Sequence, residues 1–372
     1  MNPAPDRVPS SSRTRAPAPP RLPLAAAQYS VPGAVRATPH SQSVWFAGPG
    51  AVELRSEPLP DVAPDEVLVR AVVSALSQGT ELLVYRGQVP STLELDLPTL
   101  RGSFGFPIKY GYASVGRVVQ TGDEVRDLQA GDLVFVHHPH QTEYVVPAGM
   151  PVRLPPELDP EVGVFTANVE TAVNVLLDAN PRLGERVVVF GQGVVGLLLT
   201  QLARRAGAGL VVAVDPLDAR RTLSRQVGAD VALAPGDDLV EAIRELTDGV
   251  GADLVLEASG SSAALQSAID CVAFQGTVVV CSWYGTKSAT LELGGAFHRR
   301  RLRIVSSQVS TIDPALQPRW TPTRRLALAR DLLPTLQLRS LVTQRVPFPR
   351  AAEAYDLVDR HPEQSVQVVL TY

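Results

Sequence analysis

Three short segments of the chain carry side chains whose types and spacing could do chemistry. The first is a polar turn, Gln78-Gly79-Thr80-Glu81, which directly follows the apolar run VLVRAVVSALS. Such a turn can hold a metal ion, contact a substrate or only reverse the chain. The second is the histidine cluster HHPH, whose last residue, His140, precedes QTEYVVPAG. Because imidazole exchanges protons near neutral pH, we expect His140 to exchange protons with solvent at the mouth of a cleft, with an exposed loop histidine as the alternative.

The third segment is rich in glycine. VVVFGQGVVGLLLTQLARRAG places Gly191, Gly193 and Gly196 between an apolar strand and a helix. The first glycine permits a tight turn, the second lets a pyrophosphate approach the backbone, and the third lets the helix pack closely on the strand. The helix N-terminus offers N–H groups to the phosphates. A turn that serves packing alone is the alternative. The predicted dinucleotide turn comprises Gly191, Gln192, Gly193, Val194, Val195 and Gly196.

An acidic residue follows this turn at the expected spacing. Asp215 ends the next strand, LVVAVD, about twenty residues beyond the last glycine. A carboxylate in this place accepts hydrogen bonds from the adenosine ribose, which favours NAD over NADP. Arg220 and Arg221 are a counter-signal, because an arginine just past the strand could meet a 2′-phosphate, although Asp215 would repel that phosphate. The sequence therefore predicts NAD, with NADP less favoured, and places Arg220 in the cofactor site.

The strand and helix patterns assign these segments to two kinds of domain. From Ser43 to about Pro147, short β-branched runs alternate with Gly, Pro and Asp, which is typical of a small barrel-like β domain. From Arg186, strands and helices alternate, which predicts an α/β fold with a doubly wound parallel sheet. The predicted organisation is a disordered tail at 1–42, a catalytic β domain at 43–165, a dinucleotide-binding domain at 166–312 and a segment at 313–372 that returns to the β domain.

The composition narrows the class of protein. Of the 372 residues, 45% are hydrophobic and 19% are charged, and the formal net charge is −4, so we expect a globular protein without a nucleic-acid partner. No apolar stretch reaches the roughly 18 residues that cross a bilayer, and we expect no membrane partner and a cytoplasmic location. Cys271 and Cys281 form neither a metal nor a disulfide framework. The HHPH cluster is interrupted by Pro139 and has no second set of metal ligands elsewhere in the chain. We therefore expect no metal site on these residues.

The order of the segments resembles one known superfamily. The β-rich domain, DANPRLGERVVVFGQGVVGLLLTQLARRAGA, EASGSSAAL and the final strand are similar to the medium-chain dehydrogenase/reductases, which include the zinc-type alcohol dehydrogenases. The PRLGE, TAVN and FHRRRLRIVSSQ stretches most resemble the branch that contains bacteriochlorophyllide hydroxyethyl dehydrogenase and related alcohol dehydrogenases. The resemblance covers Ser43 to Tyr372. It implies a GroES-like catalytic domain, a Rossmann domain, nicotinamide and a small-molecule substrate in the cleft between them, and a homodimer.

The zinc ligands of that superfamily are not found at the matching positions. The turn that reads Cys-Gly-Thr-Asp in the zinc enzymes is Gln78-Gly79-Thr80-Glu81 here, and the Gly-His-Glu triplet is Gly111-Tyr112-Ala113. The third ligand position falls on Ala167, or on Glu170 if the alignment slips. HHPHQ stands in place of the four-cysteine lobe that holds a structural zinc. Because a catalytic zinc needs three protein ligands, the resemblance implies a site without zinc.

The resemblance also suggests roles for the polar residues. Thr80 stands where the zinc enzymes keep a hydroxyl that relays the alcohol proton, and a turn-capping hydroxyl is the alternative. Tyr112 could donate to a carbonyl or an alkoxide if its neighbours lower its pKa, or it could fill the vacated metal space. Gln78 could donate an amide N–H to the same oxygen or satisfy local backbone. The predicted catalytic residues are Thr80, Tyr112, His140 and Gln78. Three further positions join the predicted cofactor site: Thr171, Ser259 and Gly260.

These observations predict a zinc-independent, NAD-dependent oxidoreductase that transfers hydride between nicotinamide and a secondary alcohol or ketone of a small molecule, with secondary metabolism as one setting. Two or three hydrogen-bond donors, worth about 2.7 to 4 kcal/mol each, could replace the effect of zinc on the substrate oxygen. The nearest alternative is an NADPH-dependent quinone or enoyl reductase, against which Asp215 argues. A protein that senses NAD(H) without chemistry is the alternative outside enzymes.

Overall fold

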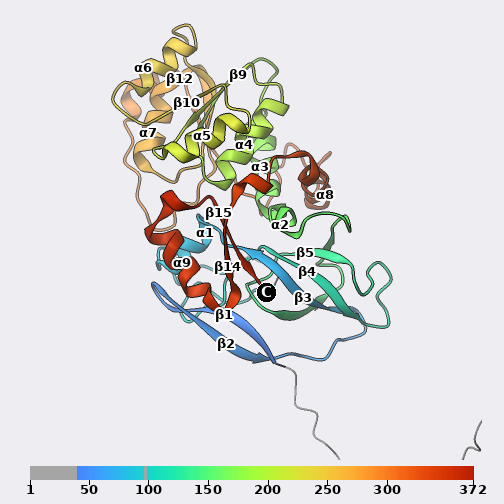
Figure 1. Ribbon diagram of the computed structural model, residues 1–372. Coiled ribbons are helices and arrows are strands. Elements are labelled where there is room, and N and C mark those ends of the chain that lie inside the picture. Colours follow the sequence, from blue (N-terminus) through green and yellow to red (C-terminus); the bar gives the residue numbers. More distant parts are fainter. Residues whose placement is uncertain (1–39, 96–98) are drawn as a thin grey trace, which may run out of the picture. The chain divides into compact units, whose positions relative to one another are not determined.

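The computed structural model describes residues 40–95 and 99–372, so the predicted tail at 1–42 lies outside the described residues except for its last three (Figure 1). The strands are β1 (His40–Gly48), β2 (Ala51–Pro58), β3 (Glu66–Ala75), β4 (Ser114–Thr121), β5 (Leu133–Val136), β6 (Glu143–Pro147), β7 (Val152–Arg153), β8 (Arg186–Phe190), β9 (Leu210–Val214), β10 (Val231–Leu233), β11 (Ala252–Glu257), β12 (Val272–Val280), β13 (Arg303–Ser306), β14 (Val342–Pro347) and β15 (Gln367–Thr371). The α-helices are α1 (Thr80–Tyr85), α2 (Pro160–Gly163), α3 (Thr166–Ala179), α4 (Val194–Arg205), α5 (Asp218–Gln226), α6 (Leu239–Leu246), α7 (Ser262–Cys271), α8 (Pro322–Leu332) and α9 (Ala351–Arg360).

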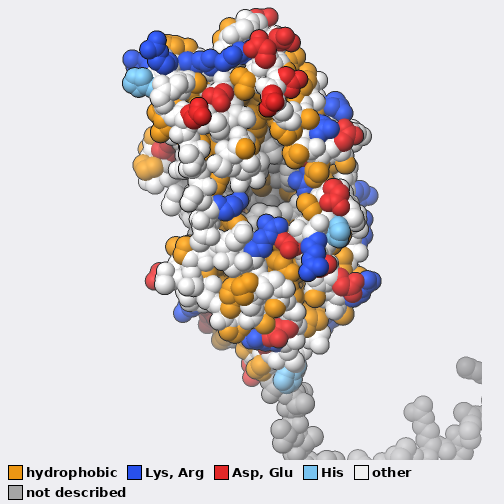
Figure 2. Space-filling model, turned by 90° about the vertical axis from the view of Figure 1, so that its left-hand side faces the viewer, with side chains coloured by type: hydrophobic (Ala, Val, Ile, Leu, Met, Phe, Trp, Pro, Cys, Tyr) orange, Lys and Arg blue, Asp and Glu red, His pale blue; other side chains and the backbone are white. Residues whose placement is uncertain are grey.

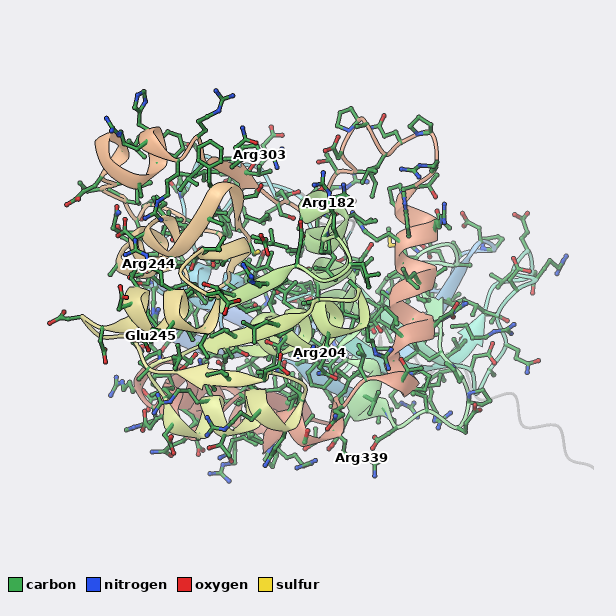
Figure 3. All side chains as sticks on the ribbon, turned by 90° about the horizontal axis from the view of Figure 1, so that it is seen from above. Arg182, Arg204, Arg244, Glu245, Arg303 and Arg339 are labelled. Atoms are coloured by element: carbon green, nitrogen blue, oxygen red, sulfur yellow. The ribbon has the colours of Figure 1, made fainter. Side chains whose placement is uncertain are left out.

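The Rossmann domain is built on a sheet of six parallel strands in the order β10-β9-β8-β11-β12-β13. Successive side chains of a strand point to opposite faces, so Val187 and Val189 of β8 pack in the cluster that contains α4. Val188 and Phe190 pack on the other face with α7. Figure 3 shows helices on both sides of these strands, with Arg244 of α6 at the outer edge. The sheet is therefore doubly wound, as the near-continuous valine runs predict.

The catalytic domain is a GroES-like β domain of mainly antiparallel strands. Its sheet has the order β14-β15-β3-β4-β5-β7, with β6 also paired to β3, while β1 and β2 form a separate hairpin. One side of the sheet packs in a cluster around Val69, Val134 and Tyr144. The other side contributes Val115 and Phe135 to a core that continues into α3 and α4. This continuous core fixes the catalytic sheet against the first helices of the Rossmann domain.

The C-terminal segment completes the catalytic sheet. Strand β15 lies between β14, to which it runs parallel, and β3, to which it runs antiparallel. Its register sets Leu370 opposite Ser74 and Val369 opposite Ala75, close to the start of the polar turn. Helix α9 packs on β14 and β15. The end of the chain therefore lies beside β3, where the N–H of Tyr372 donates to the carbonyl of Val72 at 3.3 Å (Figure 1).

The charged side chains on the surface are of both signs, in agreement with the small formal net charge of −4. Figure 2 shows hydrophobic and charged side chains of both signs interspersed over one face, with a recess near mid-height that has Lys or Arg side chains at its rim. No helix among the described residues is long and apolar enough to cross a membrane.

Candidate functional site

The glycine turn joins β8 to α4 in a conformation that only glycine tolerates at two positions. Gly191 has a φ of +83°, and a Cβ on it would lie 2.7 Å from the Cα of Ser259. A Cβ on Gly196 would lie 1.7 Å from the carbonyl oxygen of Gly191. Gly193 precedes α4, and Val194 and Val195 form its first turn. The backbone is therefore shaped for close approach of a phosphate to the free N–H groups of α4.

Asp215 is placed at the end of β9, beside this turn. Its Oδ2 accepts a hydrogen bond from the backbone N–H of Gln192 at 2.7 Å, and its Oδ1 accepts one from Leu217 at 2.9 Å. A carboxylate has about four acceptor sites, so lone pairs remain for ribose hydroxyls. The side chain of Gln192 is fully buried, donates to the carbonyl of Val189 and accepts from Thr200, so Gln192 serves the turn through its backbone.

Arg220 connects the Rossmann domain to the catalytic turn. Its Nη2 donates to Gln78 Oε1 at 3.0 Å and to the carbonyls of Pro362 and Ser365 at 3.1 Å each. A Cβ on Gly193 would lie 3.9 Å from Arg220 Nη1, so the guanidinium is beside the phosphate turn. The buried Nε has no partner among the described residues. Arg220 therefore retains an unused donor next to the place where an anionic cofactor would lie.

The hydrogen bond from Arg220 limits how Gln78 can donate to a substrate oxygen. Its Oε1 accepts from Arg220, and its Nε2 donates to Ser365 Oγ at 3.1 Å. The amide is thus held between the two domains, and only one of its N–H bonds is left for a substrate oxygen. Gln78 and Arg220, which the sequence assigns to different sites, are direct neighbours.

The loop after β11 is organised by a carboxylate that the sequence analysis missed. Glu257 is fully buried, and its Oε1 accepts from the backbone N–H of Ser259 at 2.7 Å, from Ser259 Oγ at 2.6 Å and from the N–H of Gly260 at 2.9 Å. Tyr284 contributes a further hydrogen bond to Oε2 at 3.2 Å. Ser259 lies against Gly191, because a Cβ on Gly191 would be 2.7 Å from the Cα of Ser259, and Gly260 is the next residue of the same loop. The sequence signal that could have identified Glu257 is its place as an acidic residue at the end of the apolar run DLVLEAS.

Three hydroxyls meet at the polar turn. The phenol of Tyr112 lies close to the hydroxyls of Ser77 and Thr80, and Thr80 is the first residue of α1. Burial, together with the nearby charge of Glu81, raises the pKa of Tyr112 to about 12. The catalytic role that the sequence predicts for Tyr112 required neighbours that lower its pKa, whereas burial and Glu81 raise it overall. Tyr112 is therefore a neutral phenol that can donate a hydrogen bond but does not readily take or lose a proton.

His140 is fully buried and does not lie at a cleft mouth, which differs from the sequence expectation. Its Nε2 is 3.0 Å from Glu81 Oε2, and its Nδ1 is 2.6 Å from Ser74 Oγ. Because the carboxylate can only accept, we assign the proton to Nε2, and Ser74 then donates to Nδ1 and accepts from Tyr372, whose OH is 2.8 Å away. Tyr355 donates to Glu81 at 2.8 Å. Both ring nitrogens of His140 are therefore engaged by protein groups.

The other two histidines of the cluster occupy separate environments. His138 stacks on Tyr144 with ring centroids 3.7 Å apart, and burial lowers its pKa to about 3. His137 is 26% exposed and lies 3.7 Å from Glu170 Oε2. Among the described residues, no group of three or more His, Cys, Asp or Glu side chains could hold a metal ion.

Helix α3 carries Glu170 and Thr171, the remaining candidates. Arg325 of α8 donates to Glu170 Oε1 from Nε at 3.0 Å and from Nη2 at 2.9 Å, which commits this carboxylate to an ion pair. The hydroxyl of Thr171 donates to the carbonyl of Ala167 at 3.0 Å, one turn earlier in the same helix. Ala167 has no ligating atom. Neither alignment of the third ligand position therefore yields a free metal ligand.

Comparison with known proteins places this geometry in a family. Residues 194–326 match the model described as zinc-binding dehydrogenase. The D-guloside 3-dehydrogenase of Escherichia coli (strain K12) is 31% identical over 331 residues, which cover 84% of this chain and 94% of that relative.

Two solved structures share the fold. The zinc-binding-dehydrogenase homologue of Sinorhizobium meliloti 1021, solved with NADP, has a TM-score of 0.73 at 22% identity and covers 90% of this chain and 100% of its own. The galactitol-1-phosphate dehydrogenase of Escherichia coli has a TM-score of 0.72 at 21% identity, with 89% and 100% covered. Sequence and fold agree over both domains, and the chain belongs to the medium-chain dehydrogenase/reductase superfamily.

Proposed function

We propose that this dehydrogenase transfers hydride between NAD and a secondary alcohol or ketone of a small polyol or glycoside, without a zinc ion. The observation that carries the proposal is that Gln78 and Tyr112 occupy two positions that match metal ligands of the zinc enzymes, with the hydroxyls of Ser77 and Thr80 close to the phenol of Tyr112. Ser77 and Thr80 flank Gln78 in the chain, and the hydrogen bond from Arg220 to Gln78 connects the turn to the dinucleotide domain.

The residues at the three zinc positions do not fit the metal. Gln78 is held by Arg220 and Ser365, Tyr112 is a neutral phenol close to Ser77 and Thr80, and Ala167 offers no donor atom. Zinc in proteins takes thiolate, imidazole or carboxylate ligands, and a catalytic site needs three of them. We therefore assign the polarisation of the substrate oxygen to hydrogen bonds.

In this proposal the hydroxyl cluster holds the substrate oxygen. A donor aimed at a developing oxyanion contributes about 2.7 to 4 kcal/mol, so Tyr112 and Thr80 together can supply the several kcal/mol that a metal would provide. When bound, NAD supplies the hydride acceptor. Its phosphates would be held by the turn at Gly193 and by Arg220, and its adenosine ribose by Asp215.

The preference for NAD rests on Asp215, whose charge would repel a 2′-phosphate. Arg220 weakens this argument, because its free Nε could also receive such a phosphate. We favour NAD because Asp215 stands at the ribose end of the turn, whereas the guanidinium of Arg220 is directed toward Gln78.

The substrate class is inferred from the relative that acts on a D-guloside at carbon 3, a secondary alcohol on a sugar ring. The homodimer, the cytoplasmic location and the setting in secondary metabolism stay predictions.

The test is an assay of the purified full chain with NAD or NADP and a panel of methyl glycosides, polyols and simple secondary alcohols. We expect NAD reduction with a ring or chain secondary alcohol, unchanged by a chelator, and no stoichiometric zinc in the same sample. Loss of activity on chelation with recovery on added zinc would refute the metal-free site. Turnover confined to NADPH and activated double bonds would favour the reductase alternative, and tight NADH binding without any turnover would favour a sensor.

Two variants test the named roles. Tyr112→Phe should lower kcat by about 10²- to 10³-fold while NADH binding is retained, because one donor to the substrate oxygen is lost. Tyr85→Phe is a matched control, since the Tyr85 hydroxyl donates to the carbonyl of Gly50 and not to the cluster.

Asp215→Ser should weaken NADH binding and relax the preference against NADPH. An unchanged preference contradicts the contact between Asp215 and the ribose.

A further inference from the structure

Oxidation of an alcohol releases a proton, and the predicted catalytic residues provide no free group to accept it. Burial and the nearby charge of Glu81 raise the pKa of Tyr112 to about 12, so its phenol already carries its proton and cannot accept another. His140 has no exposed surface, and both of its nitrogens are bonded to Glu81 and Ser74. A proton acceptor must therefore be sought among residues that the sequence did not assign.

His137 lies on the side of the catalytic sheet that faces α3. Strand β5 ends at Val136, so His137 is the first residue beyond it. The rings of His137 and Phe135 are 4.9 Å apart, edge to face. Phe135 belongs to the core that continues into α3. The imidazole therefore lies at the junction between the catalytic sheet and α3, the helix that carries Thr171 of the predicted cofactor site.

A fixed carboxylate stands behind one nitrogen of this ring. His137 Nε2 is 3.7 Å from Glu170 Oε2, while Glu170 Oε1 is held by two hydrogen bonds from Arg325. Arg325 Nη1 also donates to Asn174 Oδ1 at 2.6 Å, one turn further along α3. The side chain of Glu170 is 8% exposed, against 26% for His137. The carboxylate is therefore immobile, whereas the imidazole reaches accessible space.

The other nitrogen of His137 is available. Among the described residues, no partner is found for Nδ1, while the backbone carbonyl of His137 accepts from Thr99 Oγ1 at 2.6 Å and anchors the loop. A partly exposed histidine with one nitrogen near a carboxylate, and with no partner for the other among the described residues, has the arrangement of a general base oriented by an acid.

We propose that His137 is the general acid–base residue of the dehydrogenase, with Glu170 as the positioning residue that orients its ring. This proposal rests on the proposed function. In the oxidation, the C–H bond of the alcohol breaks and its electron pair leaves as hydride to the nicotinamide. The O–H bond breaks, its electron pair forms the carbonyl, and the proton goes to His137 Nδ1, directly or through one water. In the reduction the same atom returns the proton.

The first test is chemical rescue. We expect His137→Ala to lower kcat by about 10²- to 10⁴-fold, with NADH affinity and the unfolding midpoint unchanged, and we expect free imidazole in the buffer to restore part of the rate. His298→Ala, which removes an exposed histidine, should show neither loss nor rescue. His137→Gln guards against a folding defect, because it keeps a planar polar side chain and should lose rate to the same degree.

The second test separates orientation from structural support. Glu170→Gln should lower kcat without changing KM, and the same substitution in the His137→Ala background should have no further effect on kcat. If Glu170 only fastens α8 through Arg325, the Glu170→Gln effect will be equal in both backgrounds.

The outcomes distinguish the two proposals. A wild-type chain that oxidises no alcohol with NAD or NADP overturns the proposed function and this inference with it. A wild-type chain that is active, combined with His137→Ala within threefold of its kcat or with no rescue by imidazole, overturns the role of His137 alone.

Discussion

Three histidines within four residues, His137, His138 and His140, have three different surroundings. His140 is enclosed by Glu81 and Ser74, His138 stacks on Tyr144, and His137 reaches toward Glu170. Their side chains diverge because the chain leaves β5 at Val136 and turns, with the N–H of His138 donating to the carbonyl of Val136 at 2.8 Å. Identical residue types in one loop therefore have separate roles, and the charge state of each depends on its own neighbours.

The buried His138 predicts a pH dependence of stability. Its folded pKa is about 3, whereas an unfolded histidine titrates near 6.5, so between these values the unfolded chain binds a proton that the folded chain does not. The contribution is fully present above pH 6.5, and the free energy of unfolding falls by up to about 1.4 kcal/mol for each pH unit below it.

The measurement is the free energy of unfolding in denaturant from pH 7 to pH 4. His138→Phe keeps a ring for stacking on Tyr144 and should make the decline toward acid shallower, whereas the exposed His298→Phe should leave it unchanged. Equal slopes for His138→Phe and the wild type would contradict the assignment of a neutral, buried imidazole.

At the scale of elements, α3 is the helix through which the two domains and α8 are joined. Its polar residues Glu170, Asn174 and Asp178 follow at four-residue intervals, so they form one stripe along the helix. Arg325 of α8 bonds to the first two, and Ser307 donates to Asp178 at 2.6 Å. The polar stripe on this otherwise apolar helix therefore binds Arg325 of α8 and Ser307.

The ion pair between α3 and α8 should be costly to break from one side. Arg325→Met leaves the buried Glu170 charge unpaired and should lower the free energy of unfolding by about 3 to 5 kcal/mol. The double variant Arg325→Met with Glu170→Met replaces both charges by apolar groups and should recover most of that loss. Urea unfolding of the two variants is the measurement, and a double variant no more stable than the single one would argue against a buried pair.

Elements that depend on local sequence could be predicted, and contacts between distant segments could not. The turn at Gly191 and the carboxylate of Asp215 follow from spacing within one strand–helix unit, and the doubly wound sheet follows from its apolar strands. The burial of His140 depends on Tyr355 and Tyr372, which approach only when the C-terminal segment returns. The branch of the superfamily and the domain boundaries stay predictions.

At the scale of the whole molecule, Arg220 is the side chain that ties the dinucleotide turn to the catalytic turn and to residues 362–365. A hydrogen bond from a charged group to a phosphate is worth about 1.5 to 3 kcal/mol, and 1.4 kcal/mol is a factor of ten in affinity. Arg220→Met should therefore raise the Kd of NADH at least about tenfold.

Arg221→Met is the matched control. Arg221 donates to the carbonyls of Asp215 and Pro216 within its own segment and does not cross between domains, so its loss should have a smaller effect on NADH binding. Titration of NADH fluorescence measures both variants. Comparable affinities for Arg220→Met and the wild type would remove Arg220 from the cofactor site.

The position of β15 inside the catalytic sheet sets the order in which the protein can mature on the ribosome. Strand β3 is synthesised early, but one of its neighbours, β15, is made only after all the strands of the Rossmann sheet. The Rossmann sheet, whose strands are all contained within residues 186–306, is translated before that and can close first. Until β15 emerges, the edge of β3 that will receive it has unpaired backbone groups, which makes the nascent chain vulnerable to intermolecular strand pairing during that interval.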